Sequence, residues 1–255
     1  MKTSWKYIIV LLLTFCSAGL YSKQKSSTIM KHETTIETKN LALKYLVREP
    51  KIKTDKRKGI ILLHGVGSNE KDFFGLANYL PDDFYVISAR GPFTLGGDRY
   101  AWYNVDFSTG KPVYDAKQEE VSREIISTFV RQIRLEYMLD DVYLGGFSQG
   151  AIMSYSIGLT QPKSVRGIVA LSGRLLIEIQ PLVKKSDDLS KLSVFVAHGT
   201  QDRTLGIAYA REANTYLKQL GVDLTYTEYD NAHHISESVL KDLRDWMTKQ
   251  DSAQP

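Results

Sequence analysis

The chain has 255 residues, of which 43% are hydrophobic and 24% are charged, a composition typical of globular proteins and a length that suits one large α/β domain or two small ones. The formal net charge is only +4, and no dense run of Lys and Arg interleaved with aromatic residues occurs in the sequence. Nucleic-acid binding is therefore not expected.

The N-terminus has the organisation of a secretory signal peptide. Lys2 and Lys6 supply positive charge, residues 7–15 form a short apolar run, and the small residues 17–19 follow it. The apolar run is too short to span a bilayer comfortably. We therefore expect residues 1–22 to be a signal peptide and the protein to be exported to the periplasm or the extracellular space. An uncleaved anchor or a buried strand is the alternative.

Cys16 is the only cysteine and lies at the end of the apolar run. Residues 13–16 resemble the bacterial lipobox, in which the cysteine carries the lipid, although Phe15 stands where that motif has a small residue. Attachment of a lipid at Cys16 is thus an alternative to simple cleavage. With cleavage near this point the mature domain contains no disulfide, and its hydrophobic core alone must stabilise it.

Residues 23–38 are predicted to be a polar linker, and residues 39–250 to be the folded domain. The first apolar segment of this domain alternates with polar residues, which predicts a half-exposed strand, whereas the later short runs are continuously apolar and predict strands buried on both faces. These segments, with a final β-branched and aromatic one, are residues 41–48, 59–63, 84–89, 141–145, 167–171, 193–197 and 224–229.

Helical patterns fall between these segments. They cover residues 70–79, 116–139, 149–160, 207–220 and 239–247, with Asn69 as an expected N-cap and Gly221 as an expected C-cap. Strands that alternate with helices predict an α/β architecture, with a mostly parallel central sheet covered on both faces. Residues 90–115 and 173–192 are less regular, and neither insertion is long enough to form a large lid.

Ser148 follows one of the buried strands and lies between Gly146 and Gly150. This G-x-S-x-G spacing is typical of a nucleophile elbow, a strained turn that lifts the serine hydroxyl above the carboxyl edge of a parallel sheet. The Gln149 N–H would then point to the oxyanion of a reaction intermediate. The glycine-rich loop 64–68, which follows an earlier strand, offers the Val66 N–H as a second donor.

The acid and the base of a catalytic triad should follow the serine in that order. Asp202 comes just after the strand 193–197, where a carboxylate can orient a histidine. The other acids that could do so are Asp187, Asp188 and Asp230, none of which follows a strand as directly.

The catalytic histidine is expected in the loop between the last strand and the last helix. That loop contains two adjacent candidates, His233 and His234, and chemistry alone does not distinguish them. His64 precedes the serine and is expected to support its own loop, and His198 and His32 are expected to be non-catalytic. Neither H-E-x-x-H nor a cysteine cluster occurs, so no metal site and no cofactor are expected.

Five segments in this order resemble the phospholipase/carboxylesterase family of α/β hydrolases, which includes acyl-protein thioesterases and small bacterial carboxylesterases. They are LLHGVGSNEKDF, ARGPFTLGGDRYAWYNV, GGFSQGA, HGTQD and YDNAHHIS, and the resemblance covers residues 60–246. Aligned on the family's Tyr-x-x-x-His-x-hydrophobic ending, the last segment favours His233. Ala151 stands where the family usually has glycine, the apolar-apolar-proline segment that usually follows the acid is replaced by residues 204–206, and a signal peptide is unusual in this family.

The sequence therefore predicts an exported serine hydrolase that cleaves carboxyl esters, with short acyl chains preferred. Ser148, His233 and Asp202 would form the triad, and Trp102 and Tyr103 would line the substrate pocket. Alternatives are a feruloyl or depolymerase-type esterase, a thioesterase or a peptidase on the same fold, and, least favoured, a non-catalytic binding protein. The expected partner is a small-molecule ester, and contact with a membrane is expected only through a lipid at the N-terminus.

Overall fold

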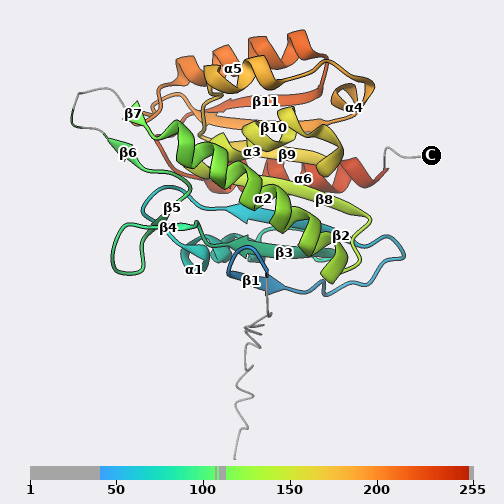
Figure 1. Cartoon of the computed structure of the whole chain (residues 1–255). Coiled ribbons are helices and arrows are strands. Elements are labelled where there is room, and N and C mark those ends of the chain that lie inside the picture. Colours follow the sequence, from blue (N-terminus) through green and yellow to red (C-terminus); the bar gives the residue numbers. More distant parts are fainter. Residues whose placement is uncertain (1–40, 107, 109–112, 253–255) are drawn as a thin grey trace, which may run out of the picture. The chain divides into compact units, whose positions relative to one another are not determined.

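A seven-stranded sheet forms the centre of the structure, a computed structural model that describes residues 41–106, 108 and 113–252 (Figure 1). The predicted signal peptide, Cys16 and the predicted linker lie outside the described residues.

The strand order in the sheet is β1-β3-β2-β8-β9-β10-β11. Only β1 is antiparallel to its neighbour, and every other pair in the sheet is parallel. The carboxyl ends of the six parallel strands therefore meet at one edge, the position where parallel α/β sheets place their sites. The strands are β1 (Tyr45–Arg48), β2 (Lys58–Leu63), β3 (Phe84–Ala89), β8 (Asp141–Phe147), β9 (Gly167–Leu171), β10 (Ser193–Gly199) and β11 (Asp223–Tyr229).

Helices cover both faces of this sheet, as Figure 1 shows. One apolar cluster joins the sheet to α2, α3 and α5, and a second cluster joins the opposite face to α1 and α6. The helices are α1 (Glu70–Phe74), α2 (Ala116–Glu136), α3 (Gln149–Thr160), α4 (Asp187–Ser190), α5 (Ile207–Leu220) and α6 (Glu237–Ser252), with short 3-10 helices η1 (Gly75–Asn78), η2 (Pro162–Ser164) and η3 (Ile177–Leu182).

The irregular stretch predicted at residues 90–115 contains two short hairpins. One pairs β4 (Phe93–Thr94) with β5 (Tyr100–Ala101), and the other pairs β6 (Val105–Asp106) with β7 (Val113–Tyr114). No large lid covers the sheet edge in the part of the chain that the structure describes. Within that part, too, no helix is long and apolar enough to cross a membrane.

Most predicted elements are present, and the differences lie at the ends of strands and helices. The strand predicted over residues 41–48 covers only Tyr45–Arg48. The strands at 84–89 and 167–171 and the helices at 149–160 and 207–220 have the predicted bounds, and Gly221 caps α5 in the left-handed conformation. The helix predicted over residues 116–139 ends at Glu136, because Met138 adopts a φ of 49°. The helix predicted over residues 70–79 narrows to a 3-10 helix after Phe74.

Helix α3 packs against the end of β2 with no room for a side chain at Gly150. A Cβ atom added to Gly150 would lie 2.0 Å from the Leu63 carbonyl oxygen and 2.8 Å from that of His64. Both contacts are with backbone, which cannot move aside without separating α3 from the sheet. Glycine is therefore required at this position for steric reasons.

We expect Gly150→Ala to lower the free energy of unfolding by about 3 kcal/mol or more, because the new methyl group overlaps the β2 backbone. Urea-induced unfolding measures the change. Gly206→Ala is the matched control, since Gly206 has a φ of −56° and open space around it; its effect should stay within about 1 kcal/mol. Equal effects of the two substitutions would contradict the steric explanation.

Candidate active site

Ser148 occupies a strained turn between β8 and α3. Its φ of 54° and ψ of −114° lie in a region that residues with a Cβ rarely adopt. Its N–H donates a 2.9 Å hydrogen bond to the Leu171 carbonyl of the neighbouring strand β9. A Cβ atom on Gly146 would lie 2.2 Å from the Gly150 carbonyl carbon, so both flanking glycines are sterically required. The strained turn predicted from the G-x-S-x-G spacing is confirmed.

The His233 imidazole lies beside this turn. Its Nε2 atom is 3.0 Å from the Ser148 Oγ, and its Nδ1 atom is 2.6 Å from the Asp202 Oδ2. The Phe147 ring packs against the imidazole, with 4.8 Å between the ring centroids. With the Nδ1 proton directed to the carboxylate, the Nε2 lone pair is free to accept the serine proton.

Asp202 is buried and held on both of its oxygens. Its Oδ1 accepts hydrogen bonds of 2.8 Å from the Thr204 N–H and the Leu205 N–H, which leaves Oδ2 for His233. These two backbone donors belong to the segment in which the chain departs from the usual family pattern. The altered sequence therefore still forms a turn that orients the acid.

Two loops are tied together to bring the acid and the base into contact. The Gln201 N–H donates to the Asn231 carbonyl at 3.0 Å, and the Thr200 N–H donates to the Tyr229 carbonyl at 2.8 Å. Because these bonds fix the loop after β10 to the loop after β11, Asp202 and His233 meet although 31 positions separate them.

The same geometry shows which of the alternative residues lie near Ser148. The ring of His234 is exposed, and its carbonyl accepts a hydrogen bond from the Asn231 side chain. Asp188 begins the short helix α4 with Asp187 and pairs with Lys163. Asp230 accepts a hydrogen bond from the Gln201 side chain. The structure thus brings His233 and Asp202 to Ser148.

His198 contributes a contact that sequence reasoning missed. It is fully buried at the end of β10, its Nε2 atom lies 2.6 Å from the Leu205 carbonyl oxygen, and the same atom is 3.3 Å from the Asp202 Oδ2. The ring therefore closes the turn that holds the acid. The only signal in the sequence is the i, i+4 spacing of the two residues, which is too common to be informative.

The two N–H groups expected to bind an oxyanion lie near the serine. Gln149 is the first residue of α3, so its N–H has no partner within the helix and shares the positive end of the helix dipole. A Cβ atom on Gly65 would lie 3.5 Å from the Ser148 Cβ, which places the peptide between Gly65 and Val66 beside the serine. Among the described residues, the Val66 N–H has no backbone acceptor.

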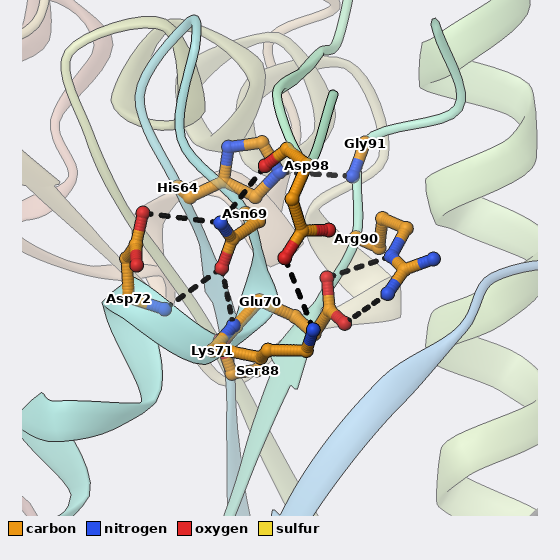
Figure 2. A network of polar contacts seen from close by, with 9 residues as sticks. All are labelled: His64, Asn69, Glu70, Lys71, Asp72, Ser88, Arg90, Gly91 and Asp98. Atoms are coloured by element: carbon orange, nitrogen blue, oxygen red, sulfur yellow. Dashed lines mark hydrogen bonds and ion pairs between the residues drawn. The ribbon is translucent and has the colours of Figure 1, made fainter. Parts of the chain in front are cut away.

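A network of polar contacts supports the glycine-rich loop 64–68 (Figure 2). His64 is fully buried, its Nε2 accepts a 3.0 Å hydrogen bond from the Gly91 N–H, and its Nδ1 lies 2.7 Å from the Gly65 carbonyl oxygen. The ring is therefore neutral with its proton on Nδ1. The expectation that His64 supports its own loop is confirmed.

The same network anchors the helix that follows the loop. Glu70 and Arg90 form a two-pronged ion pair, with the Arg90 Nε 2.7 Å from the Glu70 Oε2. Burial would raise the pKa of Glu70, but its hydrogen bonds with Arg90 hold that pKa below its ordinary value. Asn69 caps α1 by accepting from the Lys71 and Asp72 N–H groups, as the sequence predicted.

Trp102 and Tyr103 do not form an open pocket. Their exposed fractions are 0% and 1%, and the Trp102 Nε1 donates to the His64 carbonyl at 2.8 Å. The Gln149 side chain binds the backbone of both, accepting from the Trp102 N–H at 2.8 Å and donating to the Tyr103 carbonyl at 2.7 Å. The expectation that the two rings line the substrate pocket does not fit this burial, and their place is in the core beneath the site.

Comparisons with known proteins match the family and the fold of this chain. The family model described as Phospholipase/Carboxylesterase matches residues 47–250. An acyl-protein thioesterase 1 of Kluyveromyces lactis is 27% identical over 214 residues, which cover 77% of this chain and 94% of the relative. The solved carboxylesterase of Bacillus cereus superposes with a TM-score of 0.70 at 22% identity, covering 82% of this chain and 95% of that one. For the Zea mays acyl-protein thioesterase 2 the TM-score is 0.68 at 20% identity, over 80% and 97% of the two chains.

His64 predicts a pH dependence of stability. Burial lowers the pKa of His64 below its ordinary value of 6.5. The unfolded chain therefore binds a proton at this ring near pH 6.5, whereas the folded state binds it only at lower pH. The stability that the neutral ring contributes is complete above pH 6.5 and is lost as the pH falls toward the folded pKa. Between pH 7.5 and 5.5 the wild type should lose more unfolding free energy than His64→Gln, which cannot titrate. Parallel urea curves at both pH values test this, and equal losses would contradict it.

Proposed function

The chain belongs to the phospholipase/carboxylesterase family of ester hydrolases, and from this premise we propose that Ser148, His233 and Asp202 are its catalytic triad. The observation that carries the proposal is the continuous chain of hydrogen bonds, with 3.0 Å between Ser148 and His233 and 2.6 Å between His233 and Asp202. No other histidine in the described part of the chain forms a hydrogen bond with Ser148.

The reaction begins when Ser148 Oγ attacks the carbonyl carbon of a bound ester. His233 Nε2 accepts the hydroxyl proton as the bond forms, and the Asp202 carboxylate stabilises the imidazolium that results. The imidazolium then gives its proton to the departing alcohol. The Phe147 ring and the two loops tied together at Asn231 keep the imidazole in the orientation that both transfers need.

The negative charge of the tetrahedral intermediate falls on the former carbonyl oxygen. We assign its stabilisation to the N–H groups of Val66 and Gln149, one on the glycine-rich loop and one at the start of α3. Donors fixed before the reaction are worth about 3 to 4 kcal/mol each in such sites. Water then attacks the acyl-enzyme with His233 as the base, which regenerates Ser148.

The strained turn supports this role for Ser148. A serine with a φ of 54° is less stable than one in an ordinary turn by about 1–3 kcal/mol, and such strain persists where the surrounding contacts enforce it. Here the contacts of Gly146 and Gly150 enforce it. The arrangement keeps the hydroxyl at the sheet edge, toward His233 and away from the helix it precedes.

A fluorophosphonate probe tests the triad, because it labels only a serine activated by its neighbours. The wild type should be labelled at Ser148, and labelling should vanish in Ser148→Ala. His233→Ala should reduce kcat by several orders of magnitude, since loss of a triad member removes proton transfer.

His234→Ala is the matched control, since it removes the adjacent imidazole with no loss of a contact to Ser148. Its kcat should stay within about tenfold of the wild type. Labelling that survives Ser148→Ala, or the opposite ranking of the two histidine variants, would refute the assignment.

For the substrate and the location we propose short acyl esters and export from the cytoplasm. The first rests on the two short hairpins at the site, which are too small to enclose a long chain, and the second on the order of charges, apolar residues and small residues in 1–22. Ester hydrolysis by the purified protein should fall as the acyl chain lengthens from four to twelve carbons, in oxygen esters and thioesters alike. N-terminal sequencing of the native protein should begin after residue 15, and an intact Met1 would refute export by cleavage.

A further inference from the structure

Arg174 lies at the same sheet edge as Ser148 and has no part in the triad. It follows the end of β9 by three residues, after Ser172, whose φ of 49° turns the chain away from the strand. A Cβ atom on Gly173 would lie 2.5 Å from the Ala151 Cβ, so the backbone here rests on the first turn of α3. The Arg174 Cα therefore lies one residue, about 3.8 Å, beyond Gly173, whose backbone packs on the first turn of α3.

Two tyrosine rings hold the guanidinium of Arg174. Its central carbon is 5.8 Å from the ring centroid of Tyr114 and 5.7 Å from that of Tyr209. Tyr114 precedes α2 and packs on Tyr103, whose backbone is bound by Gln149, and Tyr209 lies in the first turn of α5, just after the Asp202 loop. The cation thus lies between Tyr114, whose ring packs on Tyr103, and the first turn of α5, the helix that follows the Asp202 loop.

The polar edge of this guanidinium is not used inside the protein. In the described residues Arg174 forms no hydrogen bond and no ion pair within 4.0 Å, and its side chain is half-buried. A guanidinium stacked on aromatic rings keeps its N–H groups available at the edge, in the geometry that binds a carboxylate or phosphate through two hydrogen bonds.

The acidic groups around Arg174 have other contacts. Burial, and after it the interaction with Glu178, raises the pKa of Tyr114, so its hydroxyl stays neutral. Burial raises the pKa of Glu119, which pairs with Arg123 at 3.7 Å. Neither carboxylate is placed to neutralise Arg174 by direct contact.

We propose that Arg174 is a specificity-determining residue that binds an anionic group, a carboxylate or a phosphate, on the ester substrate. The inference rests on the proposed function, since it assumes that the ester reacts at Ser148. The preferred substrates would then be esters that carry a negative charge a few bonds from the reactive carbonyl, on either the acyl or the alcohol side.

Two matched substrate pairs test this and separate the two sources of charge. Monoethyl adipate against ethyl hexanoate places a carboxylate on the acyl side, and 1-hexanoylglycerol 3-phosphate against 1-hexanoylglycerol places a phosphate on the alcohol side. In at least one pair the wild type should favour the anionic member in kcat/KM by about tenfold or more, the value of one charge-assisted hydrogen-bonded contact. Arg174→Gln should abolish that preference, mainly through KM, and leave the neutral ester within about threefold of the wild type.

Arg131→Gln is the control, since it removes an equal charge from α2 at a residue whose guanidinium contacts only Thr128 in the described structure. It should leave the preference unchanged. As a measurement on the wild type alone, raising NaCl from about 50 to 500 mM should weaken the preference without affecting the neutral ester. The inference is overturned if the wild type shows no preference in either pair, or if Arg174→Gln loses activity equally on anionic and neutral esters. In either case the proposed function still stands, provided that neutral esters are hydrolysed and Ser148 is labelled.

Discussion

The contact of α3 with β2 is the constraint on which the rest of the site depends. Only because Gly150 lets the helix backbone reach the Leu63 carbonyl does the chain turn sharply enough at Ser148 to leave its hydroxyl at the sheet edge. The same approach brings Gln149 over the loop that starts at His64, so that its side chain binds the Trp102 and Tyr103 backbone. One steric condition therefore positions Ser148, both candidate oxyanion donors and the layer beneath them.

Backbone strain at the carboxyl edge of the sheet is offset by the burial of the strands that lead to it. Ser148 and Ser172, which end neighbouring strands, both adopt positive φ. Each costs about 1–3 kcal/mol, yet β2, β9 and β10 are buried along their whole length and pack on both faces. The residues with unfavourable backbone conformations thus lie at the carboxyl edge of the sheet. Functional sites are where departures from ideal geometry are expected.

How far the sequence predicted this structure depended on whether a feature was local. Continuous apolar runs gave the strands at 84–89 and 167–171, and the glycine spacing gave the turn at Ser148, because each is determined by neighbours along the chain. Which rings face a pocket depends on packing between distant segments, so the burial of Trp102 could not be read from its loop. The contact of His198 with Asp202 depends in the same way on the turn that brings Leu205 back over β10.

Asp202 and Arg174 show how the fold separates orientation from recognition. Asp202 is saturated: two backbone N–H groups and two imidazoles surround its carboxylate, so it can orient His233 but has no capacity left for substrate. Arg174 is the reverse, because tyrosine faces fix its plane while its donors remain unused. A group such as Asp202, whose polar atoms are all hydrogen-bonded within the protein, can serve the reaction common to the family. A group such as Arg174, held only through the faces of aromatic rings, can select the substrate without disturbing that reaction.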